Sequence, residues 1–247
     1  MRRYAIACVS VAAIATAACG TSSQTEPSTT TVTQTPGATT TSPSEKPSDQ
    51  ATACGQFGGT LAGQTCTVHE ETGKYTVDMV FPSDYPDQQA LIDLLNTQRD
   101  GFLDLLKERP DREDPYALEL KGTPYQSTDT VSLVFQEYVN VGGAHPTTNY
   151  DALNYDLKTK APITFETLFK PGSDPVATLD PIVQAELTKR LDGYEIPPNP
   201  SGAEIYQSFA LTDDAVIFFL SQGAWAFEAA GPQEISIPRA DLAAILA

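Results

Sequence analysis

The chain has 247 residues, with 15 lysines and arginines against 32 aspartates and glutamates, for a formal net charge of −17. So acidic a surface repels the phosphate backbone of nucleic acids and the anionic head groups of membranes. We therefore do not expect the protein to bind nucleic acids or to adhere to anionic lipid by charge. The same charge favours basic partners, although an acidic surface also serves solubility alone.

The first eighteen residues have the pattern of an export signal. Arg2 and Arg3 precede the small, apolar residues 4–18, a segment too short and too weakly hydrophobic for a transmembrane span. Cys19 follows two alanines, as in a bacterial lipobox, although Thr16 stands where such motifs usually carry leucine. We expect residues 1–18 to be a lipoprotein signal peptide and Cys19 to carry lipid. The alternative is plain secretion, with Cys19 left as a free thiol.

Residues 19–53 form a low-complexity segment that begins at the lipidated cysteine. It is rich in threonine, serine and proline and has almost no large apolar residue. Such a sequence cannot bury enough surface to offset the entropy of ordering it, so we expect a disordered stalk of the kind that carries O-linked sugars. The remaining residues, 54–247, have the length of one ordinary domain.

Two cysteines remain once the signal peptide takes Cys8 away and lipid occupies Cys19. Cys54 and Cys66 lie in the segment CGQFGGTLAGQTC and have no other partner. In an oxidising compartment they should form a disulfide. A zinc site is the weaker alternative, because the segment has neither a CxxC pair nor a histidine cluster.

The first half of the domain combines strands with one long helix. Alternating apolar residues at 75–81 predict a half-buried strand, with 67–69 as its hairpin partner. Residues 84–110 predict an amphipathic helix that packs on a sheet, with Pro86 at the first helical position and Pro110 at the end. The charged run 111–115 lacks the Asp-x-Asp-x-Asp-Gly loop of a calcium site, and we expect a solvated connector.

Three further strands are expected at 116–120, 131–141 and 150–157. Apolar alternation along 131–141 is broken only by Glu137. The segment GGAHP between the last two strands is a hairpin turn, because Gly142 and Gly143 permit the positive φ that such a turn needs.

The second half again mixes helices and strands. We expect a short helical or turn segment at 163–169, and a helix at 174–191 that Pro181 either starts or kinks. Strands follow at 209–211, 215–220 and 235–237, and a short helix lies within 239–247. Without a repeating βαβ rhythm, this order predicts an α+β domain with a mainly antiparallel sheet.

Motifs for known chemistry are missing from the sequence. It has no GxSxG elbow, HExxH pair, P-loop or GxGxxG, so neither a metal nor a cofactor is expected. Of the two histidines, His69 is expected to be a surface residue among acids. His145 either acts as a base, with Ser208 or Ser221 as nucleophile, or has a structural or partner-contact role. The second interpretation is preferred, because no nucleophile is identified.

The segment SQGAWAFEAAGPQ carries the remaining unusual residues. Trp225, the only tryptophan, and Phe227 lie in a connection and not in a strand. Exposed loop aromatics are binding anchors in many interfaces. The preferred alternative is that both fold back and cap the core.

Four segments of the domain resemble a known family: YPDQQALIDLLNTQRDGFL, VNVGGAHPTTNYDALNYDLKTKAPITFETLF, DPIVQAELTKRL and AVIFFL with EAAGPQEISIPRADLAAILA. They are similar to the mycobacterial secreted immunogenic antigens of the MPT/MPB type. More distantly they resemble the extracellular domain of RsiV, a lysozyme-sensing anti-sigma factor. The resemblance implies a β-grasp-like fold with the Cys54–Cys66 bridge, export, and in the RsiV branch protein recognition. Esterase activity has been proposed within the family without settled catalytic residues.

Together these features predict a lipid-anchored, non-enzymatic binding domain on the extracytoplasmic face of the cell membrane. The lipobox and stalk favour tethering over the free secretion of the antigens, and the transmembrane helix of an anti-sigma factor is lacking. The expected partner is a basic protein, lysozyme being one example. The alternative is a weak carboxylesterase or envelope hydrolase that uses His145.

Overall fold

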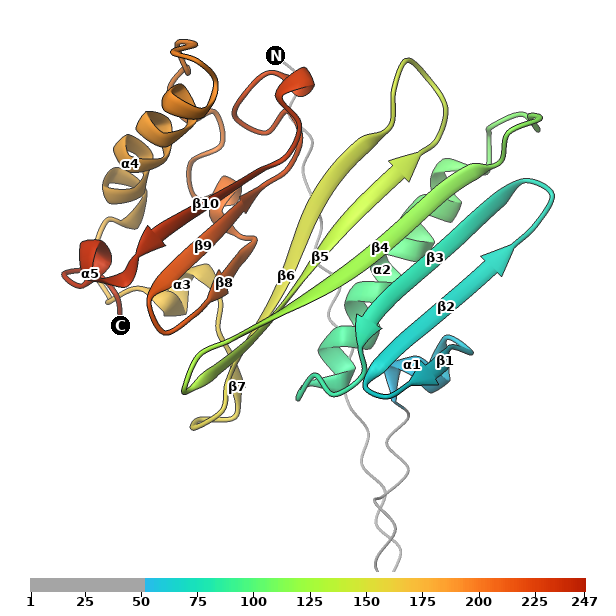
Figure 1. The fold of residues 1–247 in the computed structure, drawn as a ribbon, viewed down its shortest axis with the longest axis horizontal. Helices are drawn as coiled ribbons and strands as arrows, with labels where there is room; N and C mark the ends of the chain where they lie inside the picture. Colours follow the sequence, from blue (N-terminus) through green and yellow to red (C-terminus); the bar gives the residue numbers. More distant parts are fainter. Residues whose placement is uncertain (1–51) are drawn as a thin grey trace, which may run out of the picture. The chain divides into compact units, whose positions relative to one another are not determined.

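The computed structural model describes residues 52–247, and the predicted signal peptide, Cys19 and nearly all of the predicted stalk lie outside the described residues. Two sheets make up this part of the chain (Figure 1). In the larger sheet every neighbouring pair is antiparallel except β3 and β4, which are parallel. The predicted α+β class with mainly antiparallel strands is therefore confirmed. The larger sheet runs in sequence order through β1 (Thr60–Ala62), β2 (Thr65–Glu71), β3 (Tyr75–Pro82), β4 (Tyr116–Gln126), β5 (Thr130–Asn140), β6 (Thr147–Asp156) and β7 (Ala161–Pro162).

The long helix α2 (Gln88–Leu105) connects the two parallel strands and packs on one face of the larger sheet. Its start differs from the prediction: Pro86 lies outside the helix, which begins after Asp87. The Asp87 carboxylate accepts a hydrogen bond from the Ala90 N–H at 3.0 Å and so supplies the cap that a proline cannot. The apolar face of α2 is buried against β3, β4 and β5 through Leu91, Ile92, Leu95 and Phe102.

The second sheet has the order β10-β9-β8 and a core of its own. The second predicted helix is α4 (Pro175–Arg190), capped by Asp174, with Pro175 in its first turn. Pro181 lies inside this helix, so of the two alternatives for this residue, a start of the helix is ruled out. The remaining elements are α1 (Ala53–Gln56), α3 (Phe165–Leu168), the 3-10 helices η1 (Gly202–Tyr206) and η2 (Glu228–Ala230), β8 (Phe209–Leu211), β9 (Ala215–Leu220), β10 (Gln233–Pro238) and α5 (Arg239–Leu242).

The second sheet rests on the face of β5 and β6 that is turned away from α2. Because side chains alternate along a strand, Leu133 and Phe135 enter the core under α2, while Val134 packs against Ile217 and Phe219. Buried polar groups complete the junction. The Ser132 hydroxyl accepts from the Leu211 N–H at 3.0 Å, and the Asn154 amide donates to the Phe209 carbonyl at 2.9 Å.

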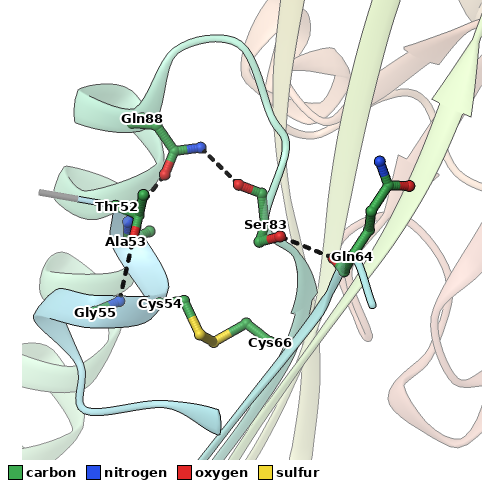
Figure 2. Close-up of a disulfide and its surroundings, with 8 residues drawn as sticks. All are labelled: Thr52, Ala53, Cys54, Gly55, Gln64, Cys66, Ser83 and Gln88. Atoms are coloured by element: carbon green, nitrogen blue, oxygen red, sulfur yellow. Dashed lines mark hydrogen bonds between the residues drawn. A yellow bond between two sulfur atoms is a disulfide. The ribbon is translucent and has the colours of Figure 1, made fainter. Parts of the chain in front are cut away.

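A disulfide between Cys54 and Cys66 fixes α1 to β2, as predicted (Figure 2). Closing a loop of this length contributes on the order of 3 kcal/mol in the chain-entropy model. Gln88 adds a second link, since its side chain accepts from the Ala53 N–H at 2.9 Å and donates to the Ser83 carbonyl at 3.1 Å. Ala53, assigned to the stalk from sequence, is buried as the first residue of α1. Within residues 52–247, the helices are all too short or too polar to cross a membrane.

Two carboxylates, one buried and one half-buried, lie on the face of β5 and β6 that packs against α2. Glu137 is only 7% exposed and accepts a hydrogen bond from the Asn149 amide at 3.0 Å. Asp151, on the neighbouring strand, accepts from the Gln98 amide at 2.7 Å. Burial raises the pKa of both carboxyls, and the charge of Asp151 raises the pKa of Glu137 further.

Replacing Glu137 by glutamine should therefore stabilise the protein at neutral pH. Because its folded pKa is raised, the Glu137 carboxyl favours the folded state most below the ordinary glutamate pKa of about 4.3. That contribution declines as the pH rises from there through the raised folded value. Urea unfolding of the full chain at neutral pH should show a higher midpoint for Glu137→Gln. The variant should also lose less stability between about pH 4 and pH 7.

The matched control is Glu119→Gln, which removes an exposed charge from the adjacent strand β4. Its midpoint should follow that of the unchanged protein at each pH. Equal behaviour of the two variants would contradict a penalty from the buried charge.

Candidate functional site

His145 lies at the tip of the β5–β6 hairpin, where the sequence placed it. The turn uses positive φ at Gly142 and Gly143, 78° and 103°, a conformation that side chains with a Cβ disfavour. The Asn140 side chain accepts from the Gly142 N–H at 3.2 Å and closes the turn. The hairpin thus presents His145 at one end of the two strands.

Both ring nitrogens of His145 face acceptors. Its Nε2 lies 3.0 Å from the Glu228 carboxylate, and its Nδ1 lies 3.0 Å from the Pro146 carbonyl oxygen. Which nitrogen donates depends on the tautomer, but both contacts hold the ring in one orientation. A general base must be within hydrogen-bond reach of the group whose proton it takes, and the partners of the two ring nitrogens are a carboxylate and a carbonyl.

The two serines proposed as nucleophiles are engaged elsewhere. The Ser208 hydroxyl donates to the Tyr150 carbonyl at 2.7 Å, and the Ser221 hydroxyl accepts from the Tyr150 N–H at 3.0 Å. Together they fasten the second sheet to the middle of β6. Neither contact connects a hydroxyl to His145, so the predicted Ser–His pair is not assembled among the described residues.

The loop between β9 and β10 lies beside the hairpin. Gln222 and Thr148 exchange two hydrogen bonds: the Gln222 N–H donates to the Thr148 carbonyl at 2.9 Å, and the Thr148 N–H donates to the Gln222 side chain at 3.0 Å. The His145–Glu228 pair is a second link between the same two loops. Two segments far apart in the sequence therefore form one surface.

Trp225 and Phe227 have different environments within this loop. Trp225 is 4% exposed, and its indole N–H donates to the Pro197 carbonyl at 2.8 Å, so it caps the second core. Phe227 is 44% exposed and meets Tyr194, itself 50% exposed, edge to face at 4.9 Å between ring centroids. The expectation that both fold back is thus confirmed for Trp225 and wrong for Phe227, whose ring packs on another exposed ring. We call His145, Tyr194, Phe227 and Glu228 the loop-end surface.

Sequence reasoning missed two members of this surface. Glu228 follows Phe227 directly, but nothing local indicates that it meets a histidine on another hairpin. Tyr194 lies in the segment after α4 and carries no motif. Only the three-dimensional contacts with Phe227 and His145 reveal these roles.

His69 lies on β2, within the larger sheet, and is exposed as predicted. A hydrogen bond to Asp78 at 2.6 Å raises its pKa above the ordinary value, with a smaller effect from Glu71. The acidic run 111–115 is exposed throughout, as expected for a connector. Among residues 52–247, no cluster of three histidine, cysteine or carboxylate side chains could hold a metal ion.

Comparison with known proteins places this fold in a family. A family model described as a protein of unknown function, DUF3298, matches residues 166–240. The chain is 43% identical over 196 residues to Esterase Rv3036c of Mycobacterium tuberculosis, covering 76% of this chain and 86% of that protein. It is 38% identical over 202 residues to Immunogenic protein MPT64 of the same species, covering 79% and 89%.

A solved structure shares the fold at low identity. It is a DUF3298 family protein from Pseudomonas aeruginosa PAO1, with a TM-score of 0.54 and 16% identity, over 76% of this chain and 95% of that chain. The likeness extends over nearly all of that protein but concerns the fold alone. Because the match to MPT64 combines 38% identity with coverage of most of both chains, this chain belongs to the MPT64-type immunogenic protein family, as its sequence motifs predicted.

Proposed function

We propose that this protein is a non-enzymatic binding domain held on the outer side of the cytoplasmic membrane by lipid on Cys19. The observation that carries the binding role is the loop-end surface. There an exposed pair of aromatic rings adjoins a histidine whose ring nitrogens contact the Glu228 carboxylate and the Pro146 carbonyl. The arrangement offers contact area and fixed polar groups, and no serine hydroxyl contacts the histidine within residues 52–247.

The chemistry of this surface fits a protein partner. Exposed aromatic rings supply a large apolar area and lose little conformational entropy on binding, which is why they recur as interface anchors. Phe227 and Tyr194 hold each other in place before any partner arrives. The neighbouring Glu228 carboxylate and the net charge of −17 favour a basic partner, such as a lysozyme-like protein.

Attachment to the membrane is supported by the sequence and by how the folded part begins. The lipobox-like residues before Cys19 and the low-complexity segment after it are typical of a tethered domain. Force applied through the stalk would reach α1 first. The Cys54–Cys66 bond passes that force covalently to β2, in the larger sheet.

Loss of the exposed Phe227 ring should weaken partner capture. We expect Phe227→Ala, in the full chain used as bait on envelope extract, to retain its partner at least about tenfold less well. Leu157→Ala is the matched control, because Leu157 is also an exposed apolar side chain but lies outside the loop-end surface. Undiminished capture by Phe227→Ala, or equal losses in the two variants, would contradict the role of the pair.

Lipid attachment is tested separately by metabolic labelling with an alkyne-tagged fatty acid. The full chain should carry the label and remain with the membrane fraction, whereas Cys19→Ala should lose the label and appear in the medium. Cys8→Ala is the control, since its cysteine lies within the predicted signal peptide and should leave labelling unchanged. Label persisting on Cys19→Ala would place the lipid elsewhere.

Ester hydrolysis is the second candidate function, because a relative at 43% identity is named an esterase. If His145 is not a base, His145→Ala should hydrolyse a p-nitrophenyl ester at the rate of the unchanged chain. An active-site-directed phosphonate should then leave no covalent adduct on any serine, as judged by mass spectrometry. An adduct on one serine, with loss of activity when that serine becomes alanine, would overturn the non-enzymatic proposal.

A further inference from the structure

The strand β4 extends beyond its neighbour β3 at one end of the larger sheet. Pairing between these two parallel strands ends at Val80 and Lys121, whereas β4 stays paired with β5 as far as Gln126. Figure 1 shows the β4–β5 hairpin reaching past the end of β3. Within the described part of the chain, residues 122–126 therefore have a strand on one side only. We call this stretch the open edge of β4.

The sequence explains why β3 stops here. Pro82 is the last residue of β3, and a proline has no N–H to donate to a neighbouring strand. The next residue, Ser83, still donates its N–H to the Gln64 carbonyl at 2.8 Å, on the side of β2. The chain then leaves the sheet for α2, so the place beside the end of β4 is not filled by β3.

The backbone groups of the open edge can be assigned from the pairing with β5. The Ser127 N–H donates to the Thr130 carbonyl at 3.0 Å, so the odd-numbered residues of this part of β4 face β5. Backbone groups of alternate residues point to the same side of a strand, and those of Pro124 and Gln126 therefore point to the open edge. Because proline has no N–H, these two residues present two carbonyls and one N–H.

A pocket of about 290 Å³ lies beside this edge. Tyr85, Val131 and Leu133 line it, and all three belong to or pack against the core under α2. Pro124 and Gln126 of the open edge line it as well. Drug-sized ligands occupy roughly 300–1,000 Å³, so the pocket suits a single side chain. It shares no residue with the loop-end surface.

An open strand edge with a pocket beside it is suited to an extended peptide. Unpaired backbone groups of an edge are a template for a further strand. Where proteins bind peptides in this way, main-chain hydrogen bonds supply affinity and pockets for alternate side chains supply specificity. The open edge of β4 and its pocket offer both features on one side of the sheet.

Charge indicates which kind of segment fits. Among the residues that line the pocket, Asp84 is the only charged one, and it is exposed. A basic side chain would therefore meet an opposite charge and no like charge there. Two copies of this chain, each with a net charge of −17, would repel each other, which favours a different protein over a second copy.

We propose that the open edge of β4 binds an extended segment of a partner protein as an added strand. One apolar side chain of the segment would enter the pocket at Val131 and Leu133. A lysine or arginine two positions along lies on the same face of a strand, and it would approach Asp84. The inference goes beyond the proposed function and concerns a different surface, so either can fail without the other.

Titration of the ¹⁵N-labelled full chain with the peptide acetyl-Thr-Val-Thr-Lys-Thr-amide tests the site. The amide signals of Asp84, Gln126 and Leu133 should shift at near-physiological salt, where long-range attraction by the net charge is screened. The same peptide with alanine in place of valine should bind about tenfold more weakly, because it buries less apolar surface. Absence of shifts, or equal binding of the two peptides, would overturn the proposal.

Two N-methylated peptides test the added strand itself. The N–H groups of alternate residues point to opposite sides of a strand, so methyl groups on the valine and lysine amides block one side. Methyl groups on the first and central threonine amides block the other side. One of these peptides should lose at least about tenfold in affinity, and the other should keep most of it. Equal affinities, whether high or low, would contradict pairing with the edge.

Matched variants locate the site on the protein. Val131→Phe fills the pocket and should weaken peptide binding at least about tenfold. Val80→Phe is the control, because Val80 is an exposed apolar residue of β3 outside the pocket, and it should bind as the unchanged chain does. If Val131→Phe fails to fold, Gln126→Pro replaces it, since it removes the N–H of the open edge and should weaken binding about fivefold.

Unweakened binding by the folded variant would overturn the proposal. Sedimentation equilibrium of the full chain tests the other occupant. A dimer that Gln126→Pro separates would assign the open edge to a second copy and would also overturn the proposal, whereas a monomer at every concentration supports it.

Discussion

The structure depends on burying both faces of one strand pair. β5 and β6 pack on α2 with one face and carry the second sheet on the other. A strand pair buried on both sides must satisfy polar groups on each side without water. Ser132 and Asn154 do so at the junction with the second sheet, and Asn149 and Gln98 do so beside α2. This requirement also assigns Ser208 and Ser221 to the backbone of Tyr150, which explains why the serines proposed as partners of a histidine form no catalytic pair.

Local patterns were enough to predict most elements, because their signals need only neighbouring residues. The leucine spacing of α2 and the glycine pair of the hairpin are examples. The start of α2 was misjudged because two local signals compete there, and the side chain of Asp87 makes the cap directly after Pro86. The division into two sheets has no local signal. Strands 209–211 and 215–220 resemble any other hairpin in sequence, and only contacts with β5 show that they form a separate layer.

The same distinction applies to the candidate sites. His145 was placed correctly at a turn, yet its partner Glu228 belongs to another loop and could not be inferred. Trp225 and Phe227 are both aromatic and lie two residues apart. Trp225 donates to the Pro197 carbonyl and packs in the second core, whereas Phe227 packs on the exposed ring of Tyr194. Glu137 did carry a signal. It interrupts the apolar alternation of 131–141, and it is buried on the same face as its apolar neighbours instead of turning outward.

Two neighbouring carboxylates, Glu137 and Asp151, connect the stability of this fold with pH. Asp151 contacts Gln98 on α2, and burial raises the pKa of its carboxyl, so its ionised form weakens the folded state. Glu137 is coupled to the same charge, since the carboxylate of Asp151 raises its pKa. Protonation of Asp151 would therefore ease the ionisation of Glu137, which links the pH of the medium to the packing of α2 on the sheet.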